Sequence, residues 1–216
     1  MRGLLIAFEG LDRSGKTTQI ELLEKWLNSI GRSVTVIKFP ERTTTIGQQI
    51  NLFLQKKTTM SKQFAHLLFS INRWELKERI ENELRSGKTV ILDRYSYSGI
   101  SYSVAQGLDY EWCAMPEYGL PKPDVLFYMK INEIGQLSKR GGFGGEVFEV
   151  KELQLKVKEV YETKIIRADW KLIDALRDIN EIREEIQSQI ENILETGCSS
   201  EINYLTYSDL FPERGS

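Results

Sequence analysis

The chain alternates short apolar runs with longer segments of helical periodicity. The apolar runs are rich in Val, Ile, Leu and Phe, and they predict strands at 4–9, 33–39, 88–93, 124–131 and 170–175. Apolar residues at helical spacing predict helices at 16–30, 61–86, 152–167 and 179–195. Strands separated by helices favour a mostly parallel five-stranded sheet with helices on both faces. The pattern therefore predicts a three-layer α/β fold whose ligands bind at the carboxyl ends of the strands.

Three segments fall outside this alternation. Residues 138–149 contain four glycines and predict a short lid loop. The stretch between 94 and 123 contains glycine and proline and reads as a loop, whereas the tail at 198–216 has a mixed composition that either packs or stays free. We find no repeat and no internal linker, so we expect residues 1–216 to form a single domain.

Charge and composition exclude several classes of protein. The 29 basic and 31 acidic residues give a net charge of −2, which argues against a nucleic-acid-coating surface. His66 is the only histidine, which rules out a His-rich metal site and a Ser-His-Asp triad, and we interpret it as a structural residue.

The cysteines and the apolar runs indicate the location. Cys113 and Cys198 are far apart in sequence, which favours two reduced thiols over a disulfide. No apolar run has the length of a membrane span or a signal peptide, so we expect a cytoplasmic or nuclear protein without a membrane partner.

One motif predicts the binding of a nucleoside triphosphate. Gly10-x4-Gly15-Lys16-Thr17 matches GxxxxGK[ST] and lies between a predicted strand and a predicted helix. In such a loop the backbone N–H groups and the helix N-terminus face the phosphates. Lys16 would reach the β- and γ-phosphates, and the Thr17 hydroxyl would bind Mg²⁺. GTPases, ATPases and kinases share this motif, so it does not identify a second substrate.

Polar residues near the other strand ends indicate a second site. Arg42 and Arg94 could clamp a second phosphate, or each could form an ordinary surface ion pair. Asp93 could orient Mg²⁺, or it could cap a helix. Phe69 and Arg73 lie four residues apart on one helix face and could bind a base, although core packing explains the same spacing.

Six segments in register resemble the thymidylate kinases, which transfer a phosphoryl group from ATP to dTMP. The resemblance is strongest to the eukaryotic and poxviral branch, and it implies a P-loop nucleoside monophosphate kinase fold, Mg²⁺ as cofactor and a homodimer. The matching segments are FEGLDRSGKTTQ (8–19), FPERTTTIG (39–47), HLLFSINRWE (66–75), DRYSYSGISYS (93–103), GLPKPD (119–124) and KRGGFG (139–144).

The resemblance implies a role for individual residues. The catalytic residues would be Arg13, Lys16, Asp93 and Arg94, and Thr17 with Asp93 would hold the metal. The ATP site would comprise Gly10, Arg13, Ser14, Gly15, Lys16, Thr17, Thr18, Arg140, Asp174 and Ala175. The dTMP site would comprise Asp12, Phe39, Arg42, Phe69, Arg73, Arg94, Ser98, Gly99, Tyr102, Phe148, Glu149 and Gln154.

The same resemblance implies how the acceptor is recognised. Asp12 would accept a hydrogen bond from the 3′-hydroxyl of the deoxyribose, and Arg13 would neutralise charge on the phosphoryl group in transit. Phe69 would stack on thymine while Arg73 donates to its O4 atom. Tyr102 would occupy the space of a 2′-hydroxyl and so reject ribonucleotides.

Three positions depart from the family pattern and leave a second enzyme reading open. Ile71, Val147 and Phe148 stand where alanine, arginine and tyrosine are expected. A broader deoxynucleoside monophosphate kinase, which also accepts dUMP or dGMP, is therefore the alternative. A non-catalytic nucleotide-binding regulator is disfavoured because all four catalytic positions carry the expected residues. We find no NKxD motif for a GTPase switch.

Overall fold

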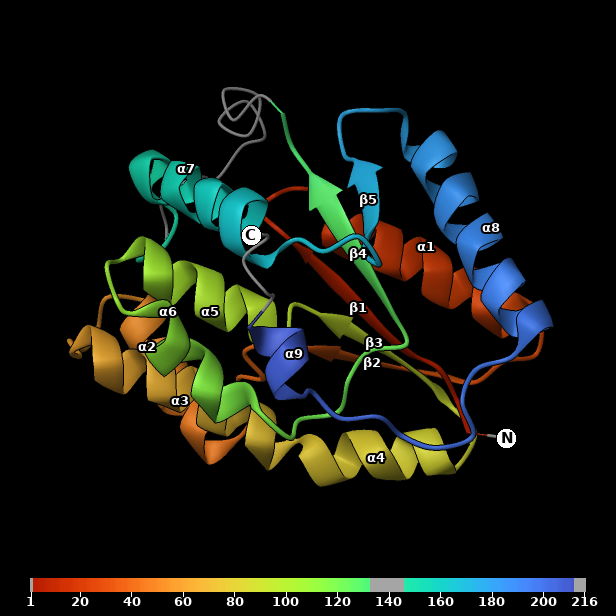
Figure 1. Ribbon diagram of the computed structural model, residues 1–216, viewed down its shortest axis with the longest axis horizontal. Coiled ribbons are helices and arrows are strands. Elements are labelled where there is room, and N and C mark those ends of the chain that lie inside the picture. The colour runs from red at the N-terminus through yellow and green to blue at the C-terminus, as the bar shows by residue number, and fades with distance from the viewer. Residues whose placement is uncertain (1, 133–145, 212–216) are drawn as a thin grey trace.

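Five parallel strands form the centre of the computed structural model, which describes residues 2–132 and 146–211 (Figure 1). All of the strand pairs are parallel, as predicted for an α/β fold. The strand order across the sheet is β2-β3-β1-β4-β5. The strands are β1 (Leu5–Gly10), β2 (Val34–Lys38), β3 (Thr89–Asp93), β4 (Val125–Lys130) and β5 (Lys171–Asp174).

Helices cover both faces of the sheet. Helices α1 and α8 lie together on one face, and α4 and α5 lie on the other (Figure 1). The described helices are α1 (Lys16–Ser29), α2 (Thr45–Leu54), α3 (Lys62–Glu75), α4 (Lys77–Arg85), α5 (Ser96–Ala105), α6 (Tyr110–Ala114), α7 (Lys151–Val160), α8 (Ile179–Thr196) and α9 (Tyr207–Leu210). Because both faces are covered, every residue of β1 and β3 is buried, which explains why these strands read as continuous apolar runs.

The strand predictions were accurate to one residue at each end, whereas two helix predictions were wrong in extent. The predicted helix 61–86 is two helices, α3 and α4, which are separated at Leu76. The predicted helix 152–167 is α7 followed by a π-helical turn at Tyr161–Ile165. Apolar periodicity continues through both breaks, so it does not reveal them.

The expected loop between 94 and 123 contains α5, α6 and a 3₁₀ turn at Met115–Glu117. Helix α5 has the sequence SYSGISYSVA, and serine, tyrosine and glycine are poor helix formers. Eight of its ten residues are buried, so tertiary packing stabilises this helix rather than intrinsic propensity. Helix α2 was also missed, although Thr44 is an N-cap whose side chain accepts a hydrogen bond from the Gly47 N–H.

The tail packs against the domain as far as residue 211. Leu205 and Leu210 are buried, and Tyr204 forms an antiparallel bridge with Pro121. The tail thus lies beside the segment that follows the 3₁₀ turn. No helix among residues 2–132 and 146–211 is long and apolar enough to cross a bilayer.

Candidate active site

The loop between β1 and α1 has the backbone that the GxxxxGK[ST] motif requires. Gly10, Arg13 and Gly15 all have positive φ angles, which glycine adopts without strain. A Cβ on Gly10 would lie 2.8 Å from the Met129 carbonyl oxygen, so only glycine fits there. The loop therefore presents its N–H groups at the start of α1, where an anion is favoured.

Lys16 fills the centre of this loop. Its Nζ lies 2.6 Å from the Leu11 carbonyl oxygen and 3.2 Å from both the Gly10 carbonyl oxygen and Ser14 Oγ. Burial, followed by the positive charge of Arg94, lowers the pKa of Lys16 to about 7. A bound polyphosphate would reverse this shift, because negative charge beside the amine favours its protonated form.

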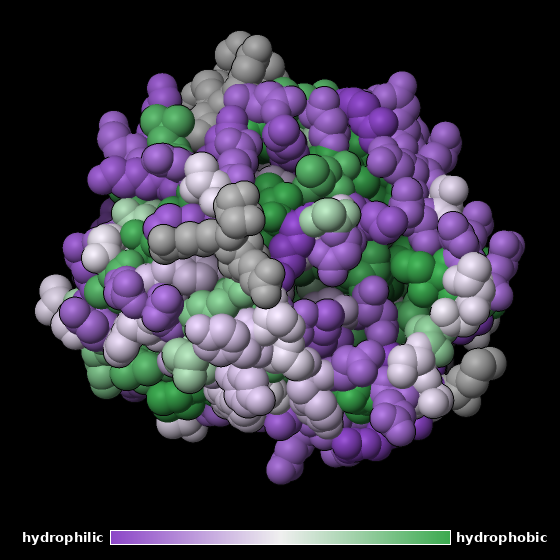
Figure 2. All heavy atoms as spheres, in the orientation of Figure 1, coloured by the Kyte–Doolittle hydropathy of each residue, from purple (hydrophilic) through white to green (hydrophobic). Residues whose placement is uncertain are grey.

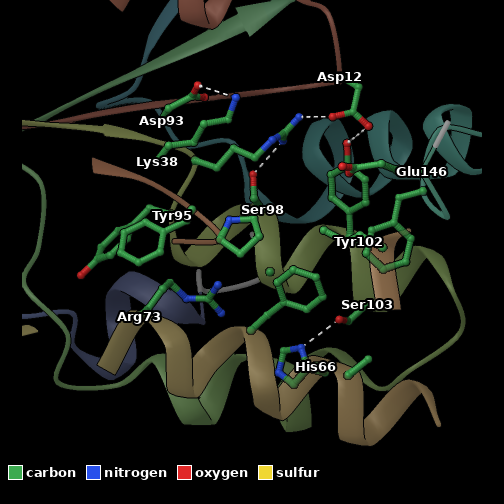
Figure 3. Close-up of a pocket in the computed structure, with 18 of the residues that line it drawn as sticks. Asp12, Lys38, His66, Arg73, Asp93, Tyr95, Ser98, Tyr102, Ser103 and Glu146 are labelled. Atoms are coloured by element: carbon green, nitrogen blue, oxygen red, sulfur yellow. Dashed lines mark hydrogen bonds and ion pairs between the residues drawn. The ribbon is translucent and has the colours of Figure 1, made fainter. Parts of the chain in front are cut away.

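Thr17 and Asp93 lie side by side at the ends of α1 and β3. The Thr17 hydroxyl donates to Asp93 Oδ2 at 3.0 Å, and Lys38 Nζ lies 3.8 Å from the same oxygen (Figure 3). The helix-cap reading of Asp93 is wrong, because Tyr95 occupies the N-cap position of α5. A hydroxyl and a carboxylate beside a phosphate loop are the hard oxygen ligands that suit nucleotide-bound Mg²⁺. Within the described residues, no cluster of three or more His, Cys, Asp or Glu side chains forms a separate metal cage.

Asp12 is surrounded by donors. Arg94 Nη2 donates to its Oδ1 at 2.5 Å, and the Tyr102 hydroxyl donates to its Oδ2 at 3.1 Å (Figure 3). Gln154 Nε2 also donates to Oδ2, at 2.7 Å. Burial alone would raise the pKa of the Asp12 carboxyl, but the charges of Arg94 and Lys16 bring it below its usual value. The carboxylate therefore balances the cations of the site, and it stays ionised in neutral solution.

A buried acid that was not predicted as a site residue organises this region. Glu9, at the end of β1, accepts hydrogen bonds from the backbone N–H groups of Tyr95 and Ser98, both at 3.0 Å. It also accepts from the Ser98 and Tyr161 hydroxyls at 2.5 and 2.8 Å. These bonds hold the start of α5 and the turn that carries Arg94, whose φ of 69° is left-handed. In the sequence, Glu9 only marked the end of an apolar run.

A cavity of about 300 Å³ extends from the phosphate loop to α3 (Figure 3). Eleven of the twelve predicted acceptor residues line it. The exception, Gln154, lies behind the wall and bonds to Asp12, Tyr102 and the Phe148 carbonyl oxygen. The eleven are Asp12, Phe39, Arg42, Phe69, Arg73, Arg94, Ser98, Gly99, Tyr102, Phe148 and Glu149.

The far end of the cavity combines an aromatic wall with a buried cation. The Phe69 ring lies 6.0 Å from the Phe148 ring, and Phe148 also packs against Tyr102. Arg73 is 2% exposed, and its guanidinium reaches toward the cavity (Figure 3). The guanidinium also pairs with the buried Glu117. Phe69 borders the cavity and also packs against a buried cluster that includes Leu54 and Leu68, so the core-packing interpretation holds in part. Glu117 carried no sequence signal and was missed.

Two further arginines of the cavity meet acidic residues next to α7. Arg42 forms an ion pair with Glu146 at 2.7 Å and a hydrogen bond with Asn51 at 2.9 Å. Arg13 Nη2 lies 3.3 Å from Glu149. The prediction of a surface ion pair is therefore partly correct for Arg42, which pairs with Glu146. Arg42 and Arg13 nevertheless also line the cavity.

The predicted ATP-binding residues are only partly brought together. Gly10, Ser14 and Thr18 lie in the phosphate loop or the first turn of α1. Asp174 and Ala175 lie at the end of β5, where Asp174 Oδ1 accepts from the Leu176 N–H at 3.0 Å, and they do not line the cavity. Arg140 and most of the predicted lid lie outside the described residues.

Only one of the three departures from the family pattern borders the cavity. Ile71 is 44% exposed on the outer face of α3, and the Val147 N–H donates to the Leu54 carbonyl oxygen. Phe148 is part of the cavity wall. Any effect on acceptor choice is therefore expected from Phe148 rather than from the other two positions.

Comparisons with known proteins agree on one family. The family model described as thymidylate kinase matches residues 8–186. The thymidylate kinase of Dictyostelium discoideum is 47% identical over 188 residues, which cover 87% of this chain and 84% of that protein. That of Homo sapiens is 35% identical over 207 residues, covering 94% and 97%. The solved structure of thymidylate kinase from Candida albicans has a TM-score of 0.86 at 37% identity, and the match covers 95% of this chain and 99% of that one.

The pKa of Lys16 predicts a proton uptake on nucleotide binding. At pH 8.5 the Lys16 amine is mostly neutral, so ATP should bind with uptake of about one proton. The uptake should vanish below about pH 6, where the free protein already carries the proton.

The lowered pKa of Lys16 also affects folding stability, because the unfolded chain binds this proton more tightly than the folded protein does. The unfavourable contribution of Lys16 to folding stability should therefore weaken as the pH rises above about 7.

Calorimetry in two buffers of different ionisation enthalpy measures this uptake directly. Lys16→Met should abolish it, whereas Lys25→Met, which changes an exposed lysine of the same helix, should leave it intact. ATP binding without proton uptake by the unmodified protein at pH 8.5 would contradict the assignment.

Proposed function

The chain belongs to the thymidylate kinase family, and we propose from this premise that it transfers the γ-phosphoryl group of ATP to dTMP, giving dTDP and ADP. One observation carries the proposal: the phosphate loop opens into a single cavity that has arginines at its near end and an aromatic wall with a buried arginine at its far end. A nucleoside monophosphate that lies along this cavity would place its phosphate beside the donor loop and its base beside α3. Proximity of this kind supplies much of the rate of phosphoryl transfer.

The cavity residues match the parts of dTMP in order. Arg94 and Arg42 would hold the acceptor phosphate, which competes with the carboxylates that now pair with them. Asp12, already fixed by Arg94 and Gln154, would accept from the 3′-hydroxyl. Thymine would stack on Phe69 and receive a hydrogen bond at O4 from Arg73.

The transferred group would pass between two cations. Lys16 would contact the β- and γ-phosphates, and Arg13 would face the equatorial oxygens on which charge accumulates in the transition state. Thr17 and Asp93 would hold Mg²⁺, which supplies further charge neutralisation when it is bound with ATP. Glu149, beside Arg13, would help to orient the guanidinium.

Two cysteines support the expectation of a cytoplasmic or nuclear location. Cys113 and Cys198 are both free thiols, and burial raises the pKa of Cys113 to about 12, which leaves that thiol unreactive. Free thiols are typical of reducing compartments.

Product analysis tests the proposed reaction. The protein would be mixed with ATP, Mg²⁺ and equal concentrations of dTMP, dUMP, dCMP, dGMP and dAMP, and dTDP should dominate the products. Several diphosphates in similar amounts would instead favour the broader kinase, and broad substrate specificity is the property described for the Candida albicans enzyme. Binding of ATP without any turnover would refute the proposal and leave a nucleotide-binding regulator.

Arg13→Ala should separate catalysis from acceptor binding. Loss of an arginine that acts on the transition state lowers the rate by about 10³–10⁵, so kcat should fall steeply while the KM for dTMP changes less than about threefold. Steady-state kinetics with Arg79→Ala, an exposed arginine of α4, as the control would measure the difference. A raised KM with an intact kcat would show that Arg13 binds the acceptor instead.

We further propose that two copies form a homodimer through an apolar stripe on α3, made of Phe64, Leu67, Ile71 and Trp74. These residues share one face and are 37–54% exposed. Trp112, Met115 and Tyr118 extend the exposed apolar surface, and green side chains reach the surface at the lower left of Figure 2, where Figure 1 places α3 and α6. A group of exposed apolar side chains on one helix face is typical of an interface, and a two-fold axis would pair it with itself.

Light scattering coupled to size exclusion tests the dimer. The unmodified protein should have twice the mass of one chain, and Ile71→Glu should yield monomers because a charge would be buried in the interface. Leu155→Glu, at an equally exposed leucine of α7, should remain dimeric. A monomeric unmodified protein, or a dimer that survives Ile71→Glu, would exclude this interface.

A further inference from the structure

Arg73 is held by a carboxylate that belongs to another part of the chain. Glu117 Oε2 accepts from Arg73 Nε at 2.7 Å, and its Oε1 accepts from Nη2 at 2.5 Å. The two side chains are only 3% and 0% exposed. This parallel arrangement fixes the plane of the guanidinium as well as its charge.

The pairing leaves one edge of the guanidinium for the cavity. Nε and one hydrogen of Nη2 donate to Glu117. The donors that remain for other acceptors are Nη1 and the second hydrogen of Nη2. Gly99 leaves room for this edge, because a Cβ at this position would lie only 2.4 Å from Nη2. The guanidinium therefore has a single orientation, and Figure 3 shows it directed toward the cavity.

Glu117 is itself held in place from two sides. It ends the 3₁₀ turn at Met115–Glu117, and the Pro116 carbonyl oxygen in that turn accepts from Trp74 Nε1 at 2.7 Å and Ser70 Oγ at 3.3 Å. Beyond the turn, Gly119 N–H donates to the Leu205 carbonyl oxygen at 2.9 Å, so the tail holds this segment from the other side. The carboxylate is therefore fixed relative to α3, and it fixes Arg73 in turn.

We propose that Glu117 is a positioning residue for the selection of the base. Because it fixes Arg73, the site prefers a base that has a carbonyl at the position that Arg73 contacts. A fixed guanidinium offers only donors, so it donates to the O4 of thymine and repels the amino group that cytosine presents there. The inference rests on the proposed dTMP kinase function and specifies how that site selects its acceptor. Without the carboxylate, the guanidinium would turn toward other acceptors and lose its alignment.

Steady-state kinetics of Glu117→Gln with dTMP and dCMP test this role. The variant keeps the shape of the side chain but loses the charge, so the KM for dTMP should rise about 10–100-fold, while kcat changes less than about threefold. The ratio of kcat/KM for dTMP over dCMP should fall about tenfold or more. Glu117→Asp, which keeps the charge, should recover part of both losses.

Asp124→Asn is the matched control. Asp124 forms a similar bidentate pair with Arg2, with side chains 10% and 5% exposed, but this pair lies outside the cavity lining. The control should lower the unfolding temperature as Glu117→Gln does, without changing the KM or the acceptor ratio. If Glu117→Gln behaves like this control, or lowers kcat at constant KM, the positioning role is refuted.

Two further measurements keep the outcomes distinct. Should Glu117→Gln fail to fold, Gly99→Ala tests the same geometry, because its Cβ displaces the guanidinium directly and should give the same loss of preference. Should the unmodified protein not turn over dTMP, the proposed function fails first. Calorimetric affinities for dTMP and dCMP then decide the inference, which predicts a preference for dTMP that Glu117→Gln removes.

Discussion

The site depends on the parallel pairing of β1 with β3 and on the buried carboxylate that closes their ends. Phe8 is paired with Asp93, so the phosphate loop and the turn that carries Arg94 leave the sheet side by side. Glu9 then binds the start of α5 through two backbone N–H groups and two hydroxyls. A buried carboxylate is tolerated because it is fully hydrogen-bonded, and these bonds hold the left-handed turn at Arg94 in place.

Charge balance explains why an acid stands inside a loop that holds phosphates. Lys16 is buried, Arg94 is half-buried, and the charge of Arg94 disfavours the charged form of Lys16. Asp12 and Asp93 provide the opposite charge from two sides. These acidic groups compensate the cations before any substrate binds, and in the proposed function an incoming phosphate would replace carboxylates as the partners of the arginines. Asp12 serves this balance, and in the proposed function the same carboxylate would also accept from a sugar hydroxyl.

The parts of the fold that were predictable are those in which local sequence and tertiary environment agree. Strands buried on both faces read as continuous apolar runs, and the phosphate loop needs glycines at fixed spacing, so both were found. Helix α5 was missed because its Ser, Tyr and Gly residues disfavour a helix that packing then stabilises. Glu9 and Glu117 were missed as site residues because a single acid has no motif. Their importance arises from partners that lie 86 or more positions from Glu9 and 44 positions from Glu117 in the chain.

The most direct test of the account is the affinity of a bisubstrate compound in which five phosphates join the 5′ positions of adenosine and thymidine. If the donor loop and the acceptor cavity form one continuous site, both halves bind together, and the compound should bind about 10²–10⁴-fold more tightly than either ATP or dTMP. Calorimetry measures all three affinities under one condition. An affinity equal to that of ATP alone would mean that the cavity does not hold the acceptor, and it would contradict the account.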